Sequence, residues 1–195
     1  MNVLDIILWS AILLLLCAAI LLAVIASRRG KHWLVLPCVA LIAIAIVWAV
    51  FGGAWTAPGI GFLVAAGILL LLLGIIAGSP LVSLVLELAG SGTETLGDHG
   101  GIIVSDDSAK PVKREILRGG MTIGYLERLA IIGAALAGQF AAVAIVVAVK
   151  GLGRFSELEN SAARERFIIG TLVSIIWAAA CAAPMVLAWT SLSYA

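Results

Sequence analysis

The chain has 195 residues, of which 63% are hydrophobic and 12% are charged, and its mean hydropathy is +1.20. A soluble domain is about half apolar and about a quarter charged, so this composition indicates a protein built for lipid. The net charge is only +1, without the strong positive charge that is typical of nucleic-acid-binding domains, so we expect no nucleic-acid partner.

Five long apolar runs indicate helices that cross a membrane. They cover residues 5–27, 33–51, 59–78, 121–149 and 162–190. Each run approaches or exceeds the ~20 residues that a helix needs to cross a bilayer. We therefore predict an all-α integral membrane bundle of about five transmembrane helices with one cytoplasmic polar loop.

One polar segment divides the chain into two membrane halves. Residues 1–90 hold three spans, followed by a short interfacial helical extension that we expect to begin at Pro80. Residues 91–119 form the polar loop, and residues 120–195 hold the last two spans. No basic residue precedes the first apolar run, as a signal peptide would require, so we interpret that run as a span.

The polar loop has two interpretations that the sequence leaves open. Its segments GIIV and VKREIL fit the strands of a small hairpin, and the second also fits a basic helical turn from Pro111 to Gly119. Basic side chains of the loop are candidates for contact with anionic lipid headgroups. These side chains are Lys110, Lys113, Arg114 and Arg118.

Lysine and arginine predict the orientation of the spans, because both concentrate in cytoplasmic loops. If all five runs span, seven basic residues fall on the side of the 91–119 loop and four on the other side. We therefore expect the N-terminus outside, and the loop and the C-terminus in the cytoplasm. In an alternative topology the fourth run breaks at Gly138–Gln139 and folds back, which places every lysine and arginine in the cytoplasm.

Polar residues interrupt the fourth run, which reads GYLERLAIIGAALAGQFAAVAIVVAVKG. Arg128, Gln139 and Lys150 are spaced by eleven residues, about three helical turns, which places them on one face of a straight helix. We expect Arg128 and Lys150 to reach opposite interfaces, and Gln139 to lie at the midplane beside Gly138. There Gln139 would bond to another helix or line a polar pathway. Glu127 is expected to pair with a basic residue of the polar loop.

Small and polar residues also gather at the start of the fifth run. Gly170 and Ser174 are four residues apart, with Thr171 between them, and such small pairs let helices approach closely. Because a short connection joins the fourth and fifth runs, we expect these two helices to pack antiparallel. Basic residues would then lie near Glu165 at the outer end of the bundle. They are Lys150 and Arg154.

The segments LERLAIIGAALAGQ, AVKGLGRF and ERFIIGTLVS resemble the C-terminal half of an uncharacterised family of bacterial, actinobacterial-type, multi-span membrane proteins. The resemblance covers about residues 119–175 and departs from the family pattern at Gly151 and Arg166. It implies a multi-pass protein of the bacterial inner membrane. It implies no activity, because the family has no assigned function.

No catalytic or cofactor-binding pattern is present, whether HExxH, GxSxG, a phosphate-binding lysine loop or a dinucleotide fingerprint. Cys17, Cys38 and Cys181 lie in apolar runs without metal-ligand spacing, so we interpret them as small buried hydrophobic residues. We therefore expect no enzyme, cofactor or metal site. We predict a homo-oligomeric membrane assembly or interaction protein, whose partner is another copy or another membrane protein. The alternative is a small channel or transporter subunit that uses the polar stripe of the fourth run.

Overall fold

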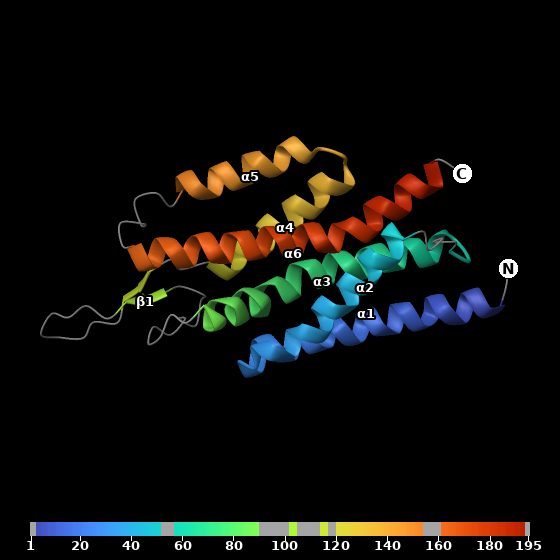
Figure 1. Ribbon diagram of the computed structural model, residues 1–195, viewed down its shortest axis with the longest axis horizontal. Helices are drawn as coiled ribbons and strands as arrows, with labels where there is room; N and C mark the ends of the chain where they lie inside the picture. Colours follow the sequence, from blue (N-terminus) through green and yellow to red (C-terminus); the bar gives the residue numbers. More distant parts are fainter. Residues whose placement is uncertain are drawn as a thin grey trace, which may run out of the picture.

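The computed structural model describes residues 3–51, 57–89, 102–104, 114–116, 120–153 and 161–193. The helices are α1 (Val3–Arg29), the 3-10 helix η1 (His32–Val35), α2 (Leu36–Val50), α3 (Ile60–Leu88), α4 (Gly120–Leu136), α5 (Phe140–Gly153) and α6 (Ser161–Ser193). They form one elongated bundle (Figure 1). The predicted all-α helical bundle is confirmed.

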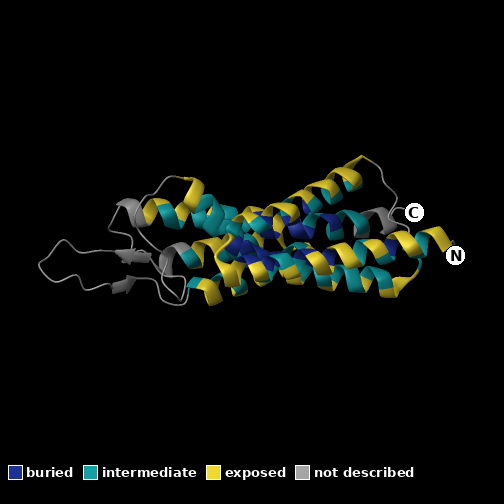
Figure 2. Cartoon of the chain, turned by 90° about the horizontal axis from the view of Figure 1, so that it is seen from below, coloured by how far each residue is buried: buried dark blue, intermediate teal, exposed yellow. Residues whose placement is uncertain are grey.

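Four helical segments are long and apolar enough to cross a bilayer. They are Val3–Arg29, His32–Val50, Ile60–Leu88 and Arg164–Ala188. Their outer faces expose many large apolar side chains, and the buried residues are confined to the interior (Figure 2). A surface of this kind suits hydrocarbon, so the fold is that of a membrane protein.

Local sequence explains where the first helices end and begin. The last turn of α1 holds Arg28 and Arg29, and cations there interact favourably with the helix dipole. Gly30 follows with φ +64°, in the left-handed region that favours glycine after a helix end. Pro37 lies in the first turn of α2, where its missing N–H has no intrahelical partner to lose.

Helix α3 runs without a break through Pro80 and ends at Leu88. The predicted helical extension from Pro80 is helical and ends close to the expected Gly90, but it continues α3 instead of forming an element of its own. Its interfacial position stays a prediction. Proline removes one backbone donor from a helix. In a membrane such a helix persists where groups from neighbouring helices satisfy the freed backbone. Pro80 is fully buried against its neighbours, so this compensation is available to it.

Between α3 and α4 the described part of the polar loop forms two short strands, β1 (Ile102–Val104) and β2 (Arg114–Ile116). They pair antiparallel, with Ile102 opposite Ile116. Of the two interpretations left open by the sequence, the hairpin is therefore the correct one. Lys110, Lys113 and Arg118 lie outside the described residues, and lipid contact by the basic loop stays a prediction.

The fourth apolar run is two helices rather than one. Helix α4 ends at Leu136, Gly138 takes φ +68°, and α5 begins at Phe140. The Gln139 N–H donates to the Ala134 carbonyl at 2.8 Å, and the Gly138 N–H donates to the Ala135 carbonyl at 3.1 Å. These two bonds form a Schellman motif, which ends a helix at a left-handed glycine. The chain then reverses, so that α4 and α5 make a helical hairpin (Figure 1).

The reversal corrects the predicted straight fourth span and agrees with the alternative in which the run breaks at Gly138–Gln139 and folds back. Arg128, Gln139 and Lys150 lie on α4, in the turn and on α5 respectively, so they form no single stripe. The eleven-residue spacing places side chains on one face only while one helix continues. Gly138 breaks that condition because it adopts a backbone conformation that other residues rarely take.

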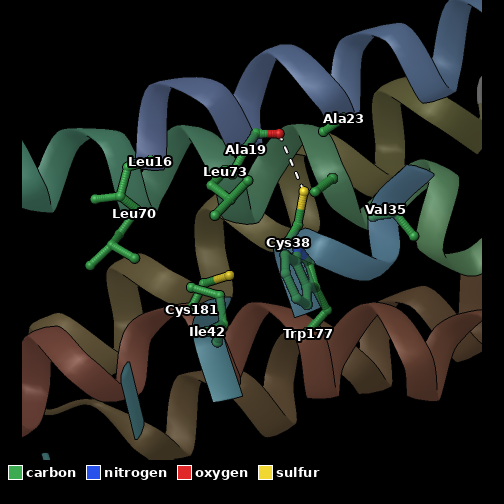
Figure 3. Close-up of a cluster of buried hydrophobic side chains, with 11 residues drawn as sticks. Leu16, Ala19, Ala23, Val35, Cys38, Ile42, Leu70, Leu73, Trp177 and Cys181 are labelled. Atoms are coloured by element: carbon green, nitrogen blue, oxygen red, sulfur yellow. Dashed lines mark hydrogen bonds between the residues drawn. The ribbon is translucent and has the colours of Figure 1, made fainter. Parts of the chain in front are cut away.

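The main core lies where α1, α2, α3 and α6 meet (Figure 3). Its members are mostly aliphatic, and they include Leu16, Ile42, Leu73 and Trp177. The only hydrogen bond drawn among them runs from the Cys38 thiol to the Ala19 carbonyl at 3.3 Å. Two of the three cysteines, Cys38 and Cys181, are buried as expected, whereas Cys17 is exposed on the surface of α1.

Candidate functional site

Arg128 lies inside the bundle at the meeting point of α3, α4 and α6, with 2% of its surface exposed. Its Nε donates to the Ile75 carbonyl at 2.9 Å, and its Nη2 donates to Ser79 Oγ at 2.9 Å. Its Nη1 donates to Ser174 Oγ at 3.2 Å. The guanidinium carbon is also 5.3 Å from the centre of the Tyr125 ring. The prediction that Arg128 reaches the interface is therefore wrong.

Glycines on α3 make the space that the arginine fills. A Cβ at Gly78 would lie 2.5 Å from Arg128 Cδ, and a Cβ at Gly74 would lie 2.6 Å from Ile132 Cδ1. A larger residue at Gly78 would displace the Arg128 side chain or α4, and one at Gly74 would displace the end of the Ile132 side chain and crowd Cys181 of α6. The two glycines are one helical turn apart on α3, so together they set how closely α4 packs against it.

Pro80 lies in the part of α3 that contacts the guanidinium. The proline ring removes the backbone donor to the carbonyl four residues earlier and crowds that turn. That carbonyl belongs to Ile76, and the Arg128 Nε donates to the carbonyl of the residue before it, Ile75. The arginine therefore supplies a strong charged donor where the α3 backbone is disturbed.

Glu127 and Lys150 form an ion pair that joins α4 to α5. Only 11% of the Glu127 side chain and 16% of the Lys150 side chain are exposed. The Lys150 Nζ also lies 5.7 Å from the centre of the Phe167 ring of α6. Two sequence expectations are thus wrong, because Glu127 pairs with Lys150 rather than with the polar loop, and Lys150 does not lie at the far interface. The reversal at Gly138 brings the two residues together.

The cluster of Glu127, Arg128 and Lys150 carries a net charge of +1 inside the bundle. Glu127 is paired with Lys150, and every hydrogen-bond acceptor of Arg128 is neutral. Among the described residues, no carboxylate lies within ion-pair distance of Arg128. A buried charge with only neutral partners is costly, because hydrogen bonds replace part of its hydration but no opposite charge offsets it. Ionisable groups at membrane depth often mark functional sites.

The remaining candidates on α6 have different surroundings. Ser174 is buried and accepts from Arg128, and a Cβ at Gly170 would lie 3.3 Å from Val82 of α3. Thr171 Oγ1 is buried and has no hydrogen-bond partner among the described residues. Glu165 is exposed near the start of α6, whereas Arg154 lies outside the described residues.

The sequence reasoning did not identify the α3 residues of this site, which are Ile75, Gly78 and Ser79. A signal for them exists. Gly74 and Gly78 are a small-xxx-small pair in an otherwise leucine-rich and isoleucine-rich run, and Ser79 and Pro80 follow directly. Such a group in a span indicates a close helix contact, but the sequence alone does not say which helix makes it.

The turn between α4 and α5 is the second unusual feature. Gly138 and Gln139 are exposed, and the Gln139 side chain makes no hydrogen bond within the described chain. Gly78 faces Arg128 and Gly74 faces Ile132, so α4 runs antiparallel to α3. From Gly74, α3 extends fourteen residues back to its first residue. In the same direction, α4 extends only four residues from Ile132 to its last residue.

At ~1.5 Å per residue, the α4–α5 turn therefore stops ~10 Å or more short of the end of α3. The ribbon agrees, because the turn ends well short of the tips of α1, α3 and α6 on that side (Figure 1). The polar turn thus lies at the depth of the apolar spans.

No protein-family model, curated protein or solved structure matches this chain. The resemblance of residues 119–175 to an uncharacterised bacterial family stays a prediction.

Proposed function

We propose that the protein is a homo-oligomeric assembly protein of the membrane, and that the α4–α5 hairpin makes the contact between copies. The observation that carries this proposal is the exposed turn at Gly138–Gln139. Irregular backbone at membrane depth is tolerated where protein or water covers it, not where lipid does. A second copy supplies that cover.

The chemistry of the turn favours a protein neighbour. The Gln139 amide has donors and an acceptor that hydrocarbon cannot satisfy. The first N–H groups of α5 also have no intrahelical partner, as at any helix start. Around them the exposed residues include the small Gly133, Ala137 and Gly138, beside the larger Leu136 and Phe140. Small residues let two backbones approach closely enough for hydrogen bonds between helices.

Cysteine crosslinking in native membranes tests the contact directly. Cys17 is the exposed native thiol and is first changed to serine, because Cys38 and Cys181 are buried. Ala137→Cys then places a thiol at the turn and keeps Gln139, and Ile44→Cys is the control at an exposed site in the middle of α2. We expect a disulfide-linked dimer from Ala137→Cys and little from Ile44→Cys. Equal yields from the two variants, or none from either, would contradict the proposal.

The oligomer should also depend on the amide itself. We expect Gln139→Leu to shift the mass of the particle in nanodiscs toward the monomer, because leucine removes the hydrogen bonds and suits lipid. Gln139→Asn keeps an amide and should retain more of the oligomer. A wild-type protein that is monomeric in every nanodisc would exclude the assembly function.

For orientation, we propose that the end of the bundle opposite the marked termini faces the cytoplasm of a bacterial inner membrane. The end of α1, which carries Arg28 and Arg29, and the start of α6, which carries Arg164, both lie at that end (Figure 1). Positive residues concentrate on the cytoplasmic side. The predicted cytoplasmic C-terminus depended on a straight fourth span. With the hairpin folded back, we propose that both termini lie outside.

Labelling of Arg154→Cys in a Cys17→Ser background distinguishes the folded-back topology from the straight fourth span. Residue 154 follows α5 closely, so the hairpin topology puts it in the cytoplasm and a straight span puts it outside. We expect a membrane-impermeant thiol reagent to label it in inverted vesicles and not in intact spheroplasts. The reverse pattern would contradict the proposed orientation.

A second candidate function is passage of a small anion, favoured by the buried cluster with net charge +1. This version does not use the predicted Arg128–Gln139–Lys150 stripe, which the fold does not form. Liposome flux of chloride, nitrate and phosphate is the test, with Lys150→Gln as the variant that removes one positive charge. Absence of flux for the wild type would exclude this candidate and leave the assembly proposal intact.

A further inference from the structure

The turn that joins α1 to η1 carries a compact group of exposed cations, Arg28, Arg29 and Lys31, which we call the basic turn. Gly30 lies among them with φ +64°, so the chain changes direction within the group. The indole of Trp33 follows, with 60% of its surface exposed. Tryptophan beside cations at the end of a span is typical of the membrane–water interface.

These cations have no acid partner in the described part of the chain. Glu87, near the end of α3, contacts the neighbouring His32, with Oε1 3.3 Å from His32 Nε2. The C-terminal dipole of α1 offsets part of the charge of Arg28 and Arg29, but it is equivalent to only about half an elementary charge. The basic turn is therefore a positive surface that an external anion could neutralise.

An exposed apolar face of α1 leads directly into the basic turn. Leu14, Leu21, Ile25 and Arg28 are separated by seven, four and three residues, which places them on one side of the helix. The three apolar members are exposed. Buried residues occupy another face of the same helix, namely Leu16, Ala19, Ala23 and Ala26.

The length of this face fits one lipid leaflet. From Leu14 to Arg28 the rise is ~21 Å at ~1.5 Å per residue, and half of the hydrocarbon core is ~15 Å thick. A ligand seated here therefore meets an apolar strip about one acyl chain long and then a group of cations. A soluble polyanion or an acidic protein surface would use only the cations.

We propose that the basic turn binds the headgroup of an anionic phospholipid, whose acyl chain lies along the exposed face of α1. The phosphate contacts Arg28 and Arg29, and Lys31 adds positive charge beside them. Trp33 lies at the level of the headgroups. This site is separate from the α4–α5 hairpin, and it does not depend on the protein being an oligomer.

Native mass spectrometry of the detergent-purified full chain tests the proposal, with phosphatidylglycerol and phosphatidylcholine as the two probes. We expect the wild type to retain phosphatidylglycerol and to retain phosphatidylcholine much less. The double variant Arg28→Gln/Arg29→Gln should bind phosphatidylglycerol about 10- to 30-fold more weakly, because each arginine near the headgroup contributes to binding. Arg28→Lys/Arg29→Lys keeps the charge and should retain most of the binding.

The matched control is Lys110→Gln/Lys113→Gln, which removes the same charge from the polar loop. We expect it to keep most of the bound phosphatidylglycerol. A larger loss in this control than in the arginine variant would overturn the proposal and assign the lipid to the loop. Equal retention of the two lipids by the wild type would also overturn it.

Soluble competitors distinguish a lipid from other anions. Glycerol phosphate should not displace phosphatidylglycerol, because it lacks the acyl chain, and efficient displacement would overturn the proposed role of the α1 face. Binding of polyglutamate to the wild type without retention of lipid would identify an acidic protein surface instead. If the arginine variant does not purify as a monodisperse protein, Lys31→Gln and the loss of wild-type lipid binding with rising salt provide the same test.

Discussion

The four-span core and the α4–α5 hairpin are held by different kinds of contact. Where α1, α2, α3 and α6 meet, the packing is apolar and includes one thiol–carbonyl hydrogen bond, from Cys38. The hairpin adds a smaller apolar cluster around Ile131 and Ile132, but its distinctive contacts are polar. Arg128 binds α3 and α6, and the Glu127–Lys150 pair closes α4 onto α5.

The difference shows how a helix without a full span can be positioned in a membrane. Between lipid and protein, an apolar side chain has little preference, so packing shape and polar contacts decide where a helix lies. The long helices are oriented by crossing the bilayer. The hairpin enters and leaves at the same end, so its position rests on the few polar groups that meet specific partners.

The largest effect is expected from Arg128→Ala, which tests whether polar contacts hold the hairpin. The change removes three hydrogen bonds from a charged donor and leaves a cavity, so we expect a loss of about 3 kcal/mol in the free energy of unfolding. Denaturant unfolding in detergent measures it. Arg164→Ala, at an exposed site, is the control and should change stability by less than about 0.5 kcal/mol. A similar small change at Arg128 would mean that apolar packing alone holds the hairpin.

The next largest effect is expected from Gly78→Ala. The new Cβ would lie 2.5 Å from Arg128 Cδ, so α4 or the arginine must move, at a cost of about 2 kcal/mol. Combined with Arg128→Ala, the same change should cost much less, because the space is then empty. Gly61→Ala meets nothing within 4 Å and provides the matched control. Simple addition of the two losses would argue against the close contact.

A more local effect is expected from Lys150→Met. This change leaves the Glu127 carboxylate nearly buried without its cation, and we expect a loss of about 1–2 kcal/mol that is concentrated in the hairpin. Hydrogen exchange should rise in α5 and change little in α1 and α2. Glu127→Gln/Lys150→Met removes both charges and should recover part of the protection. Uniform acceleration across all helices would show that the pair supports the whole bundle instead.

The smallest effect is expected in the core, from Cys38→Ser. Serine is close in size and keeps a donor for the Ala19 carbonyl, so stability should change by less than about 1 kcal/mol. Cys38→Ala loses the donor and a little volume and should cost about 1 kcal/mol. Unfolding measured as for Arg128→Ala allows direct comparison. A loss at Cys38 as large as that at Arg128 would remove the contrast between the two regions.

The sequence predicts the spans well because a membrane helix is recognised by one property, a continuous apolar run of ~20 residues. The first, second, third and fifth runs all become long apolar helices. Apolarity alone does not reveal the break at Gly138, because the apolar pattern continues on both sides of it and glycine is common in membrane helices. The distribution of lysine and arginine offers the break as an alternative topology. The regular spacing of Arg128, Gln139 and Lys150 then favours a straight helix that does not form.

The candidate site is harder to predict because it depends on which helices meet. Glu127, Arg128, Lys150 and Ser174 stand out as polar residues in apolar runs, and the structure brings them together. Their partners on α3 are a carbonyl, a serine and a glycine, none of which is unusual in a span. Only the folded arrangement shows that Gly78 provides the space that Arg128 fills.

The reversal at Gly138 also determines in which direction α6 crosses the membrane. A hairpin that enters and leaves at one end adds residues without changing the parity of the membrane crossings. A chain in which a short polar linker replaced residues 120–153 would therefore keep α6 in the same direction across the bilayer. If Gly138 were replaced by a residue that kept the helix straight, the fourth run would cross the bilayer. Helix α6 would then cross in the opposite direction, and the residues after it would lie on the other side of the membrane.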